Sequence, residues 1–392
     1  MRKIKNYNDF IVESKKELYD IIPKSIIELK DIFKSAGFKL YLVGGSVRDF
    51  INGEKPKDFD LCTDAKPEEI LSLLRGKYKV TLQGEAFGVV VVYTEDQPMG
   101  MEIATFREDM YGDKLGTTRN PDVKFSTIEG DVNRRDLTFN ALFYDLDKKE
   151  IVDLVNGLKD IEDKITRFVG DPNLRIKEDP LRILRVIRFS TRYNFPIVED
   201  NKKAIKDNAH LLSIITKERI WDEIKKGYKQ SKSFVSYLEL YNELGLWKPI
   251  FELSNINEDI IQMSKLELYL SNLFINEDYK KVYDKIVLKY KIDGDVAKIV
   301  HVLLWLESTK NMTGDTLISE LITIHKRIIA TNVDLKIIEE WFIKKGYSDV
   351  YFKLLRYVNR VNSQELMSMG YKGKALGDKI KELEINNFKE LI

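Results

Sequence analysis

Cysteine is almost absent from this chain of 392 residues, which contains only Cys62. A single cysteine excludes a disulfide framework and a thiolate zinc site, and it fits a reducing compartment. The longest apolar runs, such as 87–93 and 302–306, are far too short to span a bilayer. Residues 1–16 carry charges but lack the apolar core of a signal peptide. We therefore expect a soluble, cytoplasmic protein with no membrane partner.

The chain also lacks an excess of charge of either sign. Its 64 Lys and Arg residues face 63 Asp and Glu residues, which leaves a formal net charge of +1. The whole-chain charge therefore predicts no polyanionic partner. However, fourteen of the seventeen arginines precede residue 220, so the near-zero sum hides a local basic region.

What is present is a normal globular composition, with 43% hydrophobic and 32% charged residues, long enough for two or three domains. Only nine prolines and long stretches rich in Lys, Glu, Ile and Leu favour helix. Periodicity predicts one helix and several strands before residue 165, at 22–37, 39–45, 58–63, 87–93, 101–106 and a hairpin within 142–154. The polar, Gly-rich segment 108–123 predicts a functional loop. From about residue 175 the patterns are those of successive amphipathic helices.

A glycine turn follows the strand predicted at 39–45. Gly44 and Gly45 allow the backbone to approach an anion, and the next helix begins with free N–H groups. Ser46 adds a hydroxyl and Arg48 a forked cation suited to phosphate. The same residues would also make an ordinary tight turn between strand and helix, and both interpretations remain open on this pattern alone.

Two carboxylates lie a short distance further along. Asp58 and Asp60 flank Phe59, and alternate residues of a strand point to one face, so the two carboxylates converge. Such a repelling pair is stabilised by a divalent cation, and hard oxygen ligands favour magnesium. Glu102 on a neighbouring strand is a candidate third ligand. The alternative is a solvated strand start with two unrelated aspartates.

Together these segments carry a more specific signal. LVGGSVRD (42–49) followed by DFDLCT (58–63) resembles the signature of the tRNA nucleotidyltransferase/poly(A) polymerase family, class II members of the polymerase-beta-like nucleotidyltransferases. Four further motifs follow in the family's order: RRDLTFNAL (134–142), DLVNGLKDI (153–161), EDPLRILRVIRF (178–189) and KERIWDEIKK (217–226). The resemblance implies an α+β fold with a mixed-sheet, palm-like catalytic head at 1–166. A helical neck that recognises the base would occupy 167–230, and a helical, tRNA-binding body and tail 231–392.

The resemblance also implies roles for individual residues. Asp58 and Asp60 would be the catalytic carboxylates and would hold Mg²⁺, with Glu102 as a further candidate ligand. The nucleotide would be bound by residues of the first, second and fourth motifs: Gly44, Gly45, Ser46, Arg48, Arg134, Arg135, Asp136, Asn140, Asp179, Arg182, Arg185 and Arg188.

Asp179 and Arg182 match the family's base-reading pair. Cytosine and adenine share an exocyclic amino group beside a ring-nitrogen acceptor, so a carboxylate and a guanidinium select these two bases together. Asp179 before Pro180 is also a good helix cap, and both roles are compatible. Arg185, Arg188 and Arg192 extend the same basic face, and their mutual repulsion suggests an anionic counterpart.

The implied activity is addition of C, C and A to the 3′ end of tRNA from CTP and ATP, with release of pyrophosphate. The segment 84–92 is acidic where poly(A) polymerases carry a basic one, and the loop at 107–133 has the full length expected of a complete CCA-adding enzyme. The alternatives are a poly(A) polymerase or a partial CC- or A-adding enzyme on the same scaffold, and an inactive RNA-binding relative.

Overall fold

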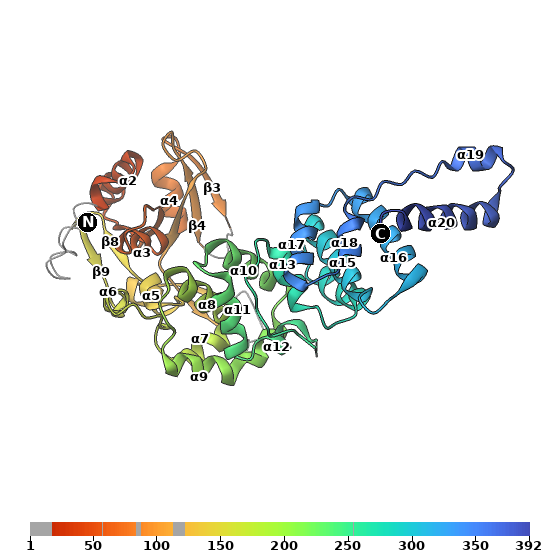
Figure 1. The fold of residues 1–392 in the computed structure, drawn as a ribbon. Helices are drawn as coiled ribbons and strands as arrows, with labels where there is room; N and C mark the ends of the chain where they lie inside the picture. The colour runs from red at the N-terminus through yellow and green to blue at the C-terminus, as the bar shows by residue number, and fades with distance from the viewer. Residues whose placement is uncertain (1–17, 57, 84–87, 113–121, 254) are drawn as a thin grey trace. The chain divides into compact units, whose positions relative to one another are not determined.

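The computed structural model describes residues 18–56, 58–83, 88–112, 122–253 and 255–392 (Figure 1). Residues 1–16, and parts of the segments 84–92 and 107–133 discussed above, lie outside these ranges. The chain forms two compact units. The first comprises Met1–Ile215, Lys229–Leu240 and Leu244–Pro249, and the second Thr216–Tyr228, Tyr241–Glu243 and Ile250–Ile392. The division into head, neck, and body and tail stays a prediction.

The first unit contains a mixed seven-stranded sheet with the strand order β3-β4-β5-β2-β1-β8-β9. Only β2 and β5 pair in parallel, and the other neighbours are antiparallel. The strands are β1 (Leu40–Val43), β2 (Asp60–Thr63), β3 (Lys79–Gln83), β4 (Val89–Tyr93), β5 (Met101–Thr105), β8 (Phe143–Asp145) and β9 (Glu150–Val152). The mixed sheet confirms the α+β fold.

Most strands predicted from apolar periodicity are present, including the hairpin of β8 and β9. The prediction of a loop at 108–123 is partly wrong. The two ends of this segment lie in strands, because β6 (Arg107–Met110) pairs antiparallel with β7 (Asp122–Phe125). This two-stranded sheet lacked an apolar signal because its residues are mostly polar and none is fully buried. β3 was also missed, since its residues are largely exposed.

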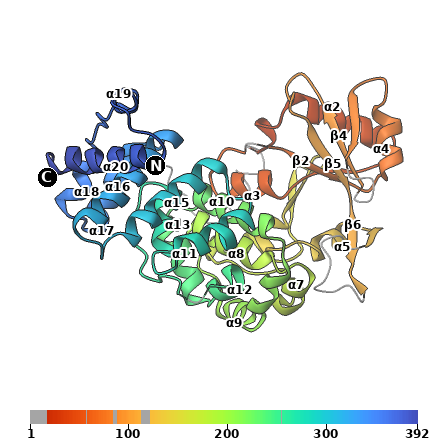
Figure 2. The same cartoon turned by 90° about the vertical axis from the view of Figure 1, so that its right-hand side faces the viewer.

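Helices of the first unit pack on the sheet and continue beyond it. α2 contacts β1, and α4 contacts β3 and β4. Figure 2 shows α4 beside β4. Tyr41, Phe106 and Phe143 form the aromatic centre of a core that also buries Cys62, as expected for a small strand residue. The helices are α2 (Lys24–Ser35), α3 (Gly45–Ile51), α4 (Pro67–Leu74), α5 (Ile128–Asn133), η3 (Thr138–Asn140), α6 (Gly157–Glu162), α7 (Pro172–Glu178), α8 (Arg182–Tyr193), α9 (Glu199–Asn208) and η4 (Ala209–Ile214).

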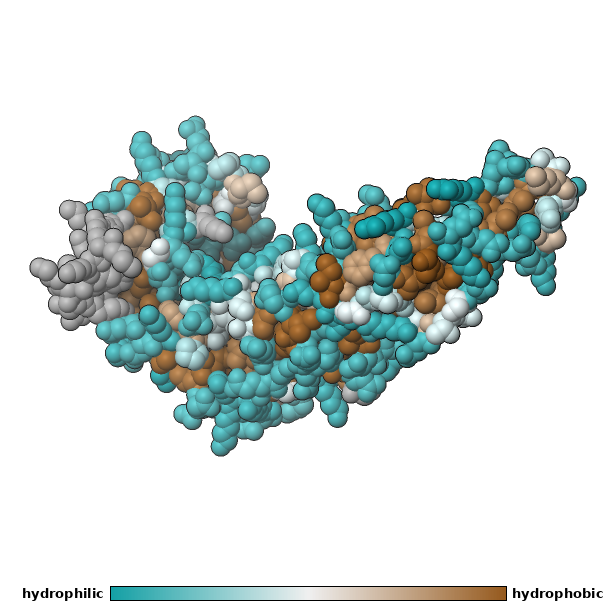
Figure 3. Space-filling model, in the orientation of Figure 1, coloured by the Kyte–Doolittle hydropathy of each residue, from teal (hydrophilic) through white to brown (hydrophobic). Residues whose placement is uncertain are grey.

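The rest of the chain is helical, as its amphipathic patterns predict. Its elements are α10 (Lys217–Gln230), α11 (Phe234–Glu243), α12 (Trp247–Phe251), α13 (Leu266–Leu273), α14 (Tyr279–Val282), η5 (Tyr283–Leu288), α15 (Gly294–Ser308), α16 (Gly314–Thr331), α17 (Leu335–Lys345), α18 (Asp349–Leu354), α19 (Ser363–Ser368) and α20 (Gly373–Lys389). Hydrophilic residues lie between the apolar patches on the face of the protein seen in Figure 3. Among the described residues, no helix combines the length and apolarity that a membrane span requires.

Candidate active site

Strand register brings the glycine turn and the carboxylates to the same edge of the sheet. β1 pairs antiparallel with β2 so that Val43, the residue before the turn, lies opposite Asp60. β2 pairs in parallel with β5, with Leu61 opposite Ile103. Asp60 and Glu102 therefore occupy neighbouring positions on one face of the sheet. The sequence prediction that Glu102 lies beside the aspartates is thus consistent with the strand pairing.

Asp60 is the electrostatic centre of this group. Desolvation by the surrounding protein, followed by the charges of Glu102 and Asp58, raises the pKa of Asp60 to about 6, although the residue keeps exposed surface. Arg135 opposes this shift. Asp58 is exposed and precedes the strand, while Phe59 is buried, as the alternation predicts.

The donor set fits a magnesium ion held partly by substrate. Among the described residues, no three His, Cys, Asp or Glu side chains are arranged to hold a metal ion. Magnesium commonly uses one or two carboxylates together with substrate phosphates and waters. Asp58 and Asp60 supply such hard oxygens, and their crowding with Glu102 is the repulsion that a cation relieves. Glu102 as a direct ligand stays a prediction.

Two guanidinium groups flank the glycine turn. Gly44 has φ +65°, which favours glycine, and a Cβ built there would lie 3.6 Å from Nη1 of Arg135. A Cβ built at Gly45 would lie 3.7 Å from Nη2 of Arg48. The turn therefore combines close backbone access with two cations, which suits an anionic ligand. Ser46 is buried, and its hydroxyl donates to the Val43 carbonyl rather than facing solvent.

A buried carboxylate holds both arginines of the second motif. Asp131 accepts a hydrogen bond from Nε of Arg134 at 2.8 Å and from Nη2 of Arg135 at 2.7 Å. Arg135 also lies over the Phe143 ring, 4.8 Å from its centroid. Burial raises the pKa of Asp131, but Arg135 and Arg134 outweigh it and hold that pKa below its usual value. The Asp131 carboxylate in α5 therefore holds Arg135 beside Gly44.

Asp136 and Asn140 are buried and bound to each other. Nδ2 of Asn140 donates to Oδ1 of Asp136 at 3.0 Å, and Nε of Arg185 donates to Oδ2 at 2.7 Å. Although burial opposes it, Arg185 and the bond from Asn140 hold the pKa of Asp136 well below its usual range. The structure thus joins three predicted nucleotide-site residues from the second and fourth motifs.

Residues of the third motif contact the short helix η3, which carries Asn140. Asp160 accepts from the Thr138 hydroxyl at 2.6 Å, within the short helix that ends at Asn140. A Cβ built at Gly157 would lie only 2.4 Å from the Thr138 carbonyl oxygen, so glycine is needed for this approach. The motif therefore packs against and hydrogen-bonds the short helix that carries Asn140.

The predicted base-reading pair lies between α7 and α8. Arg182 is buried, and its Nη1 donates to Glu178 at 2.5 Å while Nη2 donates to the Arg134 carbonyl at 2.7 Å. The Asp179 carboxylate accepts from the Leu181 backbone N–H at 3.2 Å. The N-cap of α8 is Leu181, so Asp179 does not cap that helix as the sequence predicts and instead binds the backbone of the turn before it.

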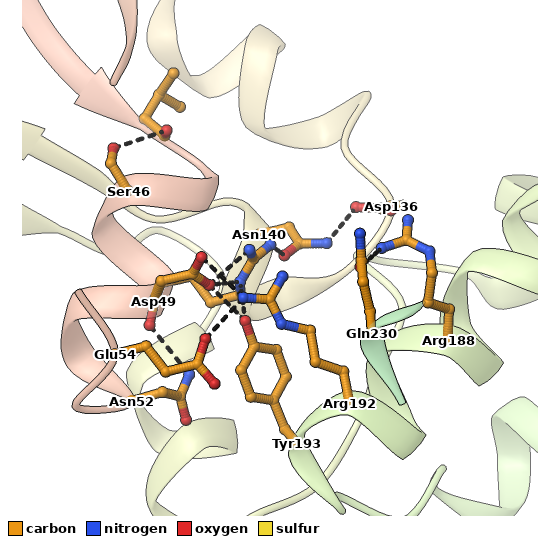
Figure 4. A network of polar contacts seen from close by, with 12 residues as sticks. Ser46, Asp49, Asn52, Glu54, Asp136, Asn140, Arg188, Arg192, Tyr193 and Gln230 are labelled. Carbon is orange, nitrogen blue, oxygen red and sulfur yellow. Dashed lines mark hydrogen bonds and ion pairs between the residues drawn. The ribbon is translucent and has the colours of Figure 1, made fainter. Parts of the chain in front are cut away.

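The other arginines of α8 also find partners inside the first unit. Arg188 donates to Gln230 at 2.8 Å, and Arg192 donates to Asp49 at 3.0 Å and to Glu54 at 2.7 Å (Figure 4). Carboxylates inside the first unit therefore compensate the charge of Arg192, whereas the amide of Gln230 is neutral, and an anionic counterpart for Arg188 stays a prediction.

Four residues of this site were not singled out from the sequence: Asp49, Asp131, Glu178 and Tyr193. Asp131 and Glu178 carry a local signal, since each stands three or four residues before an arginine it binds. Asp49 and Tyr193 are 144 positions apart and carry none.

Comparison with known proteins matches two segments of the chain to described domains. Residues 40–167 match the family described as "Poly A polymerase head domain", and residues 194–256 match "Probable RNA and SrmB- binding site of polymerase A". These two segments, which contain the first, second and third motifs and part of the helical region, carry domains named for poly(A) polymerases. The resemblance found in the motifs is thereby confirmed.

Individual relatives of both kinds are similar over more than half of the chain. A CCA-adding enzyme of Ligilactobacillus salivarius is 40% identical over 234 residues, covering 58% of this chain and 55% of that protein. The poly(A) polymerase I of Salmonella typhi is 34% identical over 249 residues, covering 60% and 52%. The chain thus spans about half the length of the curated relatives it matches.

Solved structures share the fold along nearly the whole chain. The Bacillus stearothermophilus CCA-adding enzyme in complex with CTP has a TM-score of 0.63 at 23% identity, covering 94% of both chains. The Thermotoga maritima CCA-adding enzyme complexed with tRNA has a TM-score of 0.66 at 19% identity, covering 100% of this chain and 99% of that one. These likenesses confirm the mixed-sheet head followed by helices.

Proposed function

We propose that this nucleotidyltransferase adds C, C and A to the 3′ end of tRNA, using CTP and ATP and releasing pyrophosphate without a template. The observation that carries the proposal is the pairing of β1 with β2, which sets Asp60 opposite Val43 at the start of the glycine turn. Arg48 and Arg135 stand beside that turn. Carboxylates for a metal and cations for a triphosphate therefore share one edge of the sheet.

Each group has a chemical task in this proposal. Gly44 and Gly45 admit the triphosphate close to the backbone, with Arg48 and Arg135 compensating its charge. Asp58 and Asp60 would hold Mg²⁺. The ion, when bound, neutralises charge at the α-phosphate and lowers the pKa of the attacking 3′ hydroxyl. The remaining protein groups orient the nucleotide, since phosphoryl transfer depends on positioning.

The experiment that tests the function offers purified protein, magnesium and a tRNA lacking its last three nucleotides with each triphosphate singly and together. We expect two C residues and one A to be added, after which extension stops. Long A tails would favour poly(A) polymerase, the activity named in the Salmonella typhi relative. Addition of only C or only A would indicate a partial enzyme, and no incorporation an inactive relative.

Base selection provides a separate prediction. Asp179→Ala should lower the preference for CTP and ATP over UTP and GTP by about 10- to 100-fold, because one paired contact to a base edge contributes about 1–3 kcal/mol. Selectivity is measured as the ratio of kcat/KM values for single-nucleotide addition. Asp179→Asn keeps an acceptor oxygen and should retain part of the preference.

A matched control separates this effect from loss of a hydrogen bond to the backbone. Asp171 caps α7 by accepting from the Asn173 backbone N–H at 2.9 Å, and it is exposed. Asp171→Ala should lower the free energy of unfolding by about 1 kcal/mol and leave selectivity unchanged. If Asp179→Ala behaved in the same way, its role would be structural only.

A further inference from the structure

Tyr193 ends helix α8 within a tightly packed aromatic cluster. Its ring stacks on Phe189 with an interplanar angle of 3° and a centroid distance of 6.4 Å. The edge of Phe139 meets it at 6.0 Å, and Phe195 lies tilted at 5.7 Å. Tyr193 is 5% exposed. The surrounding rings therefore fix the position of its hydroxyl group.

That hydroxyl bridges two neighbouring side chains of α3. It accepts a hydrogen bond from Nε of Arg48 at 2.7 Å and donates one to Oδ1 of Asp49 at 2.5 Å. Nε of Arg48 also lies 2.8 Å from the same Asp49 oxygen. The guanidinium, the carboxylate and the phenol thus form a closed triangle between α3 and α8. Figure 4 labels Asp49 and Tyr193, two of its corners.

The contacts continue from Arg48 through the nucleotide-site residues and return to α8. Nη1 of Arg48 donates to Oδ1 of Asn140 at 2.6 Å. Asn140 in turn donates to Asp136, which accepts from Arg185 of α8. We call this chain the α8 circuit: Tyr193, Asp49, Arg48, Asn140, Asp136 and Arg185. Its two arginines and two aspartates balance in charge.

The circuit leaves Arg48 with little freedom. Arg48 is 5% exposed, and its guanidinium also lies over the Phe189 ring, 4.7 Å from the centroid. Its Nε and Nη1 groups are engaged in the circuit, while Nη2, which pairs with Asp49 at 2.7 Å, is the nitrogen beside Gly45. All three nitrogens thus have partners, and the direction of Nη2 is set by Asp49 together with the contacts that Tyr193 makes to Nε and Asn140 to Nη1.

We propose that Tyr193 is a positioning residue for the nucleotide site: its hydroxyl orients Arg48 so that Nη2 faces the glycine turn, where the triphosphate binds. The inference rests on the proposed function, because it takes the triphosphate as the ligand of that turn. Phenylalanine would fill the same space among Phe189, Phe139 and Phe195 but could neither accept from Arg48 nor donate to Asp49. The triphosphate is common to CTP and ATP, so the effect of Tyr193 should be independent of the base.

The test compares Tyr193→Phe with the wild-type protein and with Tyr351→Phe. Tyr351 is also buried, and its hydroxyl bonds to the Thr309 hydroxyl at 3.0 Å within the second unit. Dissociation constants for CTP and ATP are measured by calorimetry with magnesium and without RNA, and kcat and KM with tRNA lacking its 3′ end. Thermal unfolding is recorded for all three proteins.

We expect Tyr193→Phe to raise Kd and KM about tenfold, by the same factor for CTP and ATP, with kcat changed less than about twofold. That pattern reports lost ground-state binding, of the size expected for a hydrogen bond to a charged group. Tyr351→Phe should lower the unfolding temperature comparably and leave both Kd values unchanged. Lysine lacks the forked guanidinium of arginine. In an Arg48→Lys background, Tyr193→Phe should therefore raise the Kd values little further.

Three results would overturn the inference: unchanged Kd values in Tyr193→Phe, unequal changes for CTP and ATP, or full additivity with Arg48→Lys. A wild-type protein that binds both triphosphates but transfers neither would contradict the proposed function, and the comparison of Kd values would still decide the role of Tyr193. A wild-type protein that binds neither would overturn both.

Discussion

Asp58→Ala and Asp60→Ala should each lower nucleotide transfer by at least about 1,000-fold while the protein remains folded. A metal ion at a phosphoryl centre supplies several kcal/mol of charge stabilisation, and each 1.36 kcal/mol corresponds to a factor of ten in rate. The measurement is single-nucleotide incorporation at saturating CTP and magnesium. Because Asp58 and Asp60 are both exposed, alanine at either position leaves no buried group without a partner.

Stability provides a second readout for Asp60. Its folded pKa of about 6 lies above the unfolded value of 3.8, so the folded state binds the proton more tightly than the unfolded state. Stability from this group is present at low pH and is lost as pH rises through 6. At pH 7.5 without divalent cations, Asp60→Ala should therefore not lower the unfolding temperature. Adding magnesium should raise that temperature in the wild-type protein and have less effect in the variant.

Glu68 provides the matched control, because it is an exposed acidic residue in the first turn of α4, outside the site. Glu68→Gln should change neither the incorporation rate nor the response to magnesium. Wild-type rates in either aspartate variant would remove these residues from the catalytic role. Loss of activity together with loss of folding would attribute the effect to structure instead.

The fold was predictable wherever burial leaves a periodic apolar pattern. β1, β4 and the paired strands β8 and β9 were found because their inward residues are apolar. β6 and β7 were missed because a small polar ladder at the surface needs no apolar residues. The register of β1 against β2 is a property of the assembled sheet, and the order of motifs alone does not contain it.

The site was predictable in its residue types but not in its internal pairing. The positions of Gly44, Gly45 and Asp60 follow from short motifs with local geometry. Arg48 looked like a free phosphate ligand, yet its guanidinium is held by partners 92 and 145 positions away. Such contacts depend on how α8 packs against α3. This packing cannot be predicted from the sequence of either helix by itself. The local basic region expected from the distribution of arginines is offset in the same way, since several of these arginines pair with carboxylates within the site.

Asp131→Ala should be the most destabilising single substitution proposed here. Asp131 is fully buried and pairs with both Arg134 and Arg135. Removing it leaves two partly buried guanidinium groups without their shared counter-charge, which costs about 3–5 kcal/mol of unfolding free energy. We expect the unfolding temperature to fall by about 10 °C. Asp163→Ala, which removes the exposed ion pair with Lys159, should change it by less than about 2 °C.

Asp131→Asn removes the charge of the side chain but keeps its volume. The pH dependence of stability then shows how much the charge contributes. The folded pKa of Asp131 lies below the unfolded value of 3.8, so its stabilising contribution is present above that value and is lost as pH falls. The stability difference between wild type and Asp131→Asn should therefore be full near pH 7 and narrow below about pH 4. Because Arg135 stands beside Gly44, the folded Asn variant should also bind triphosphate more weakly. A difference that persisted unchanged at pH 3 would show that packing, rather than the ion pair, holds these arginines in place.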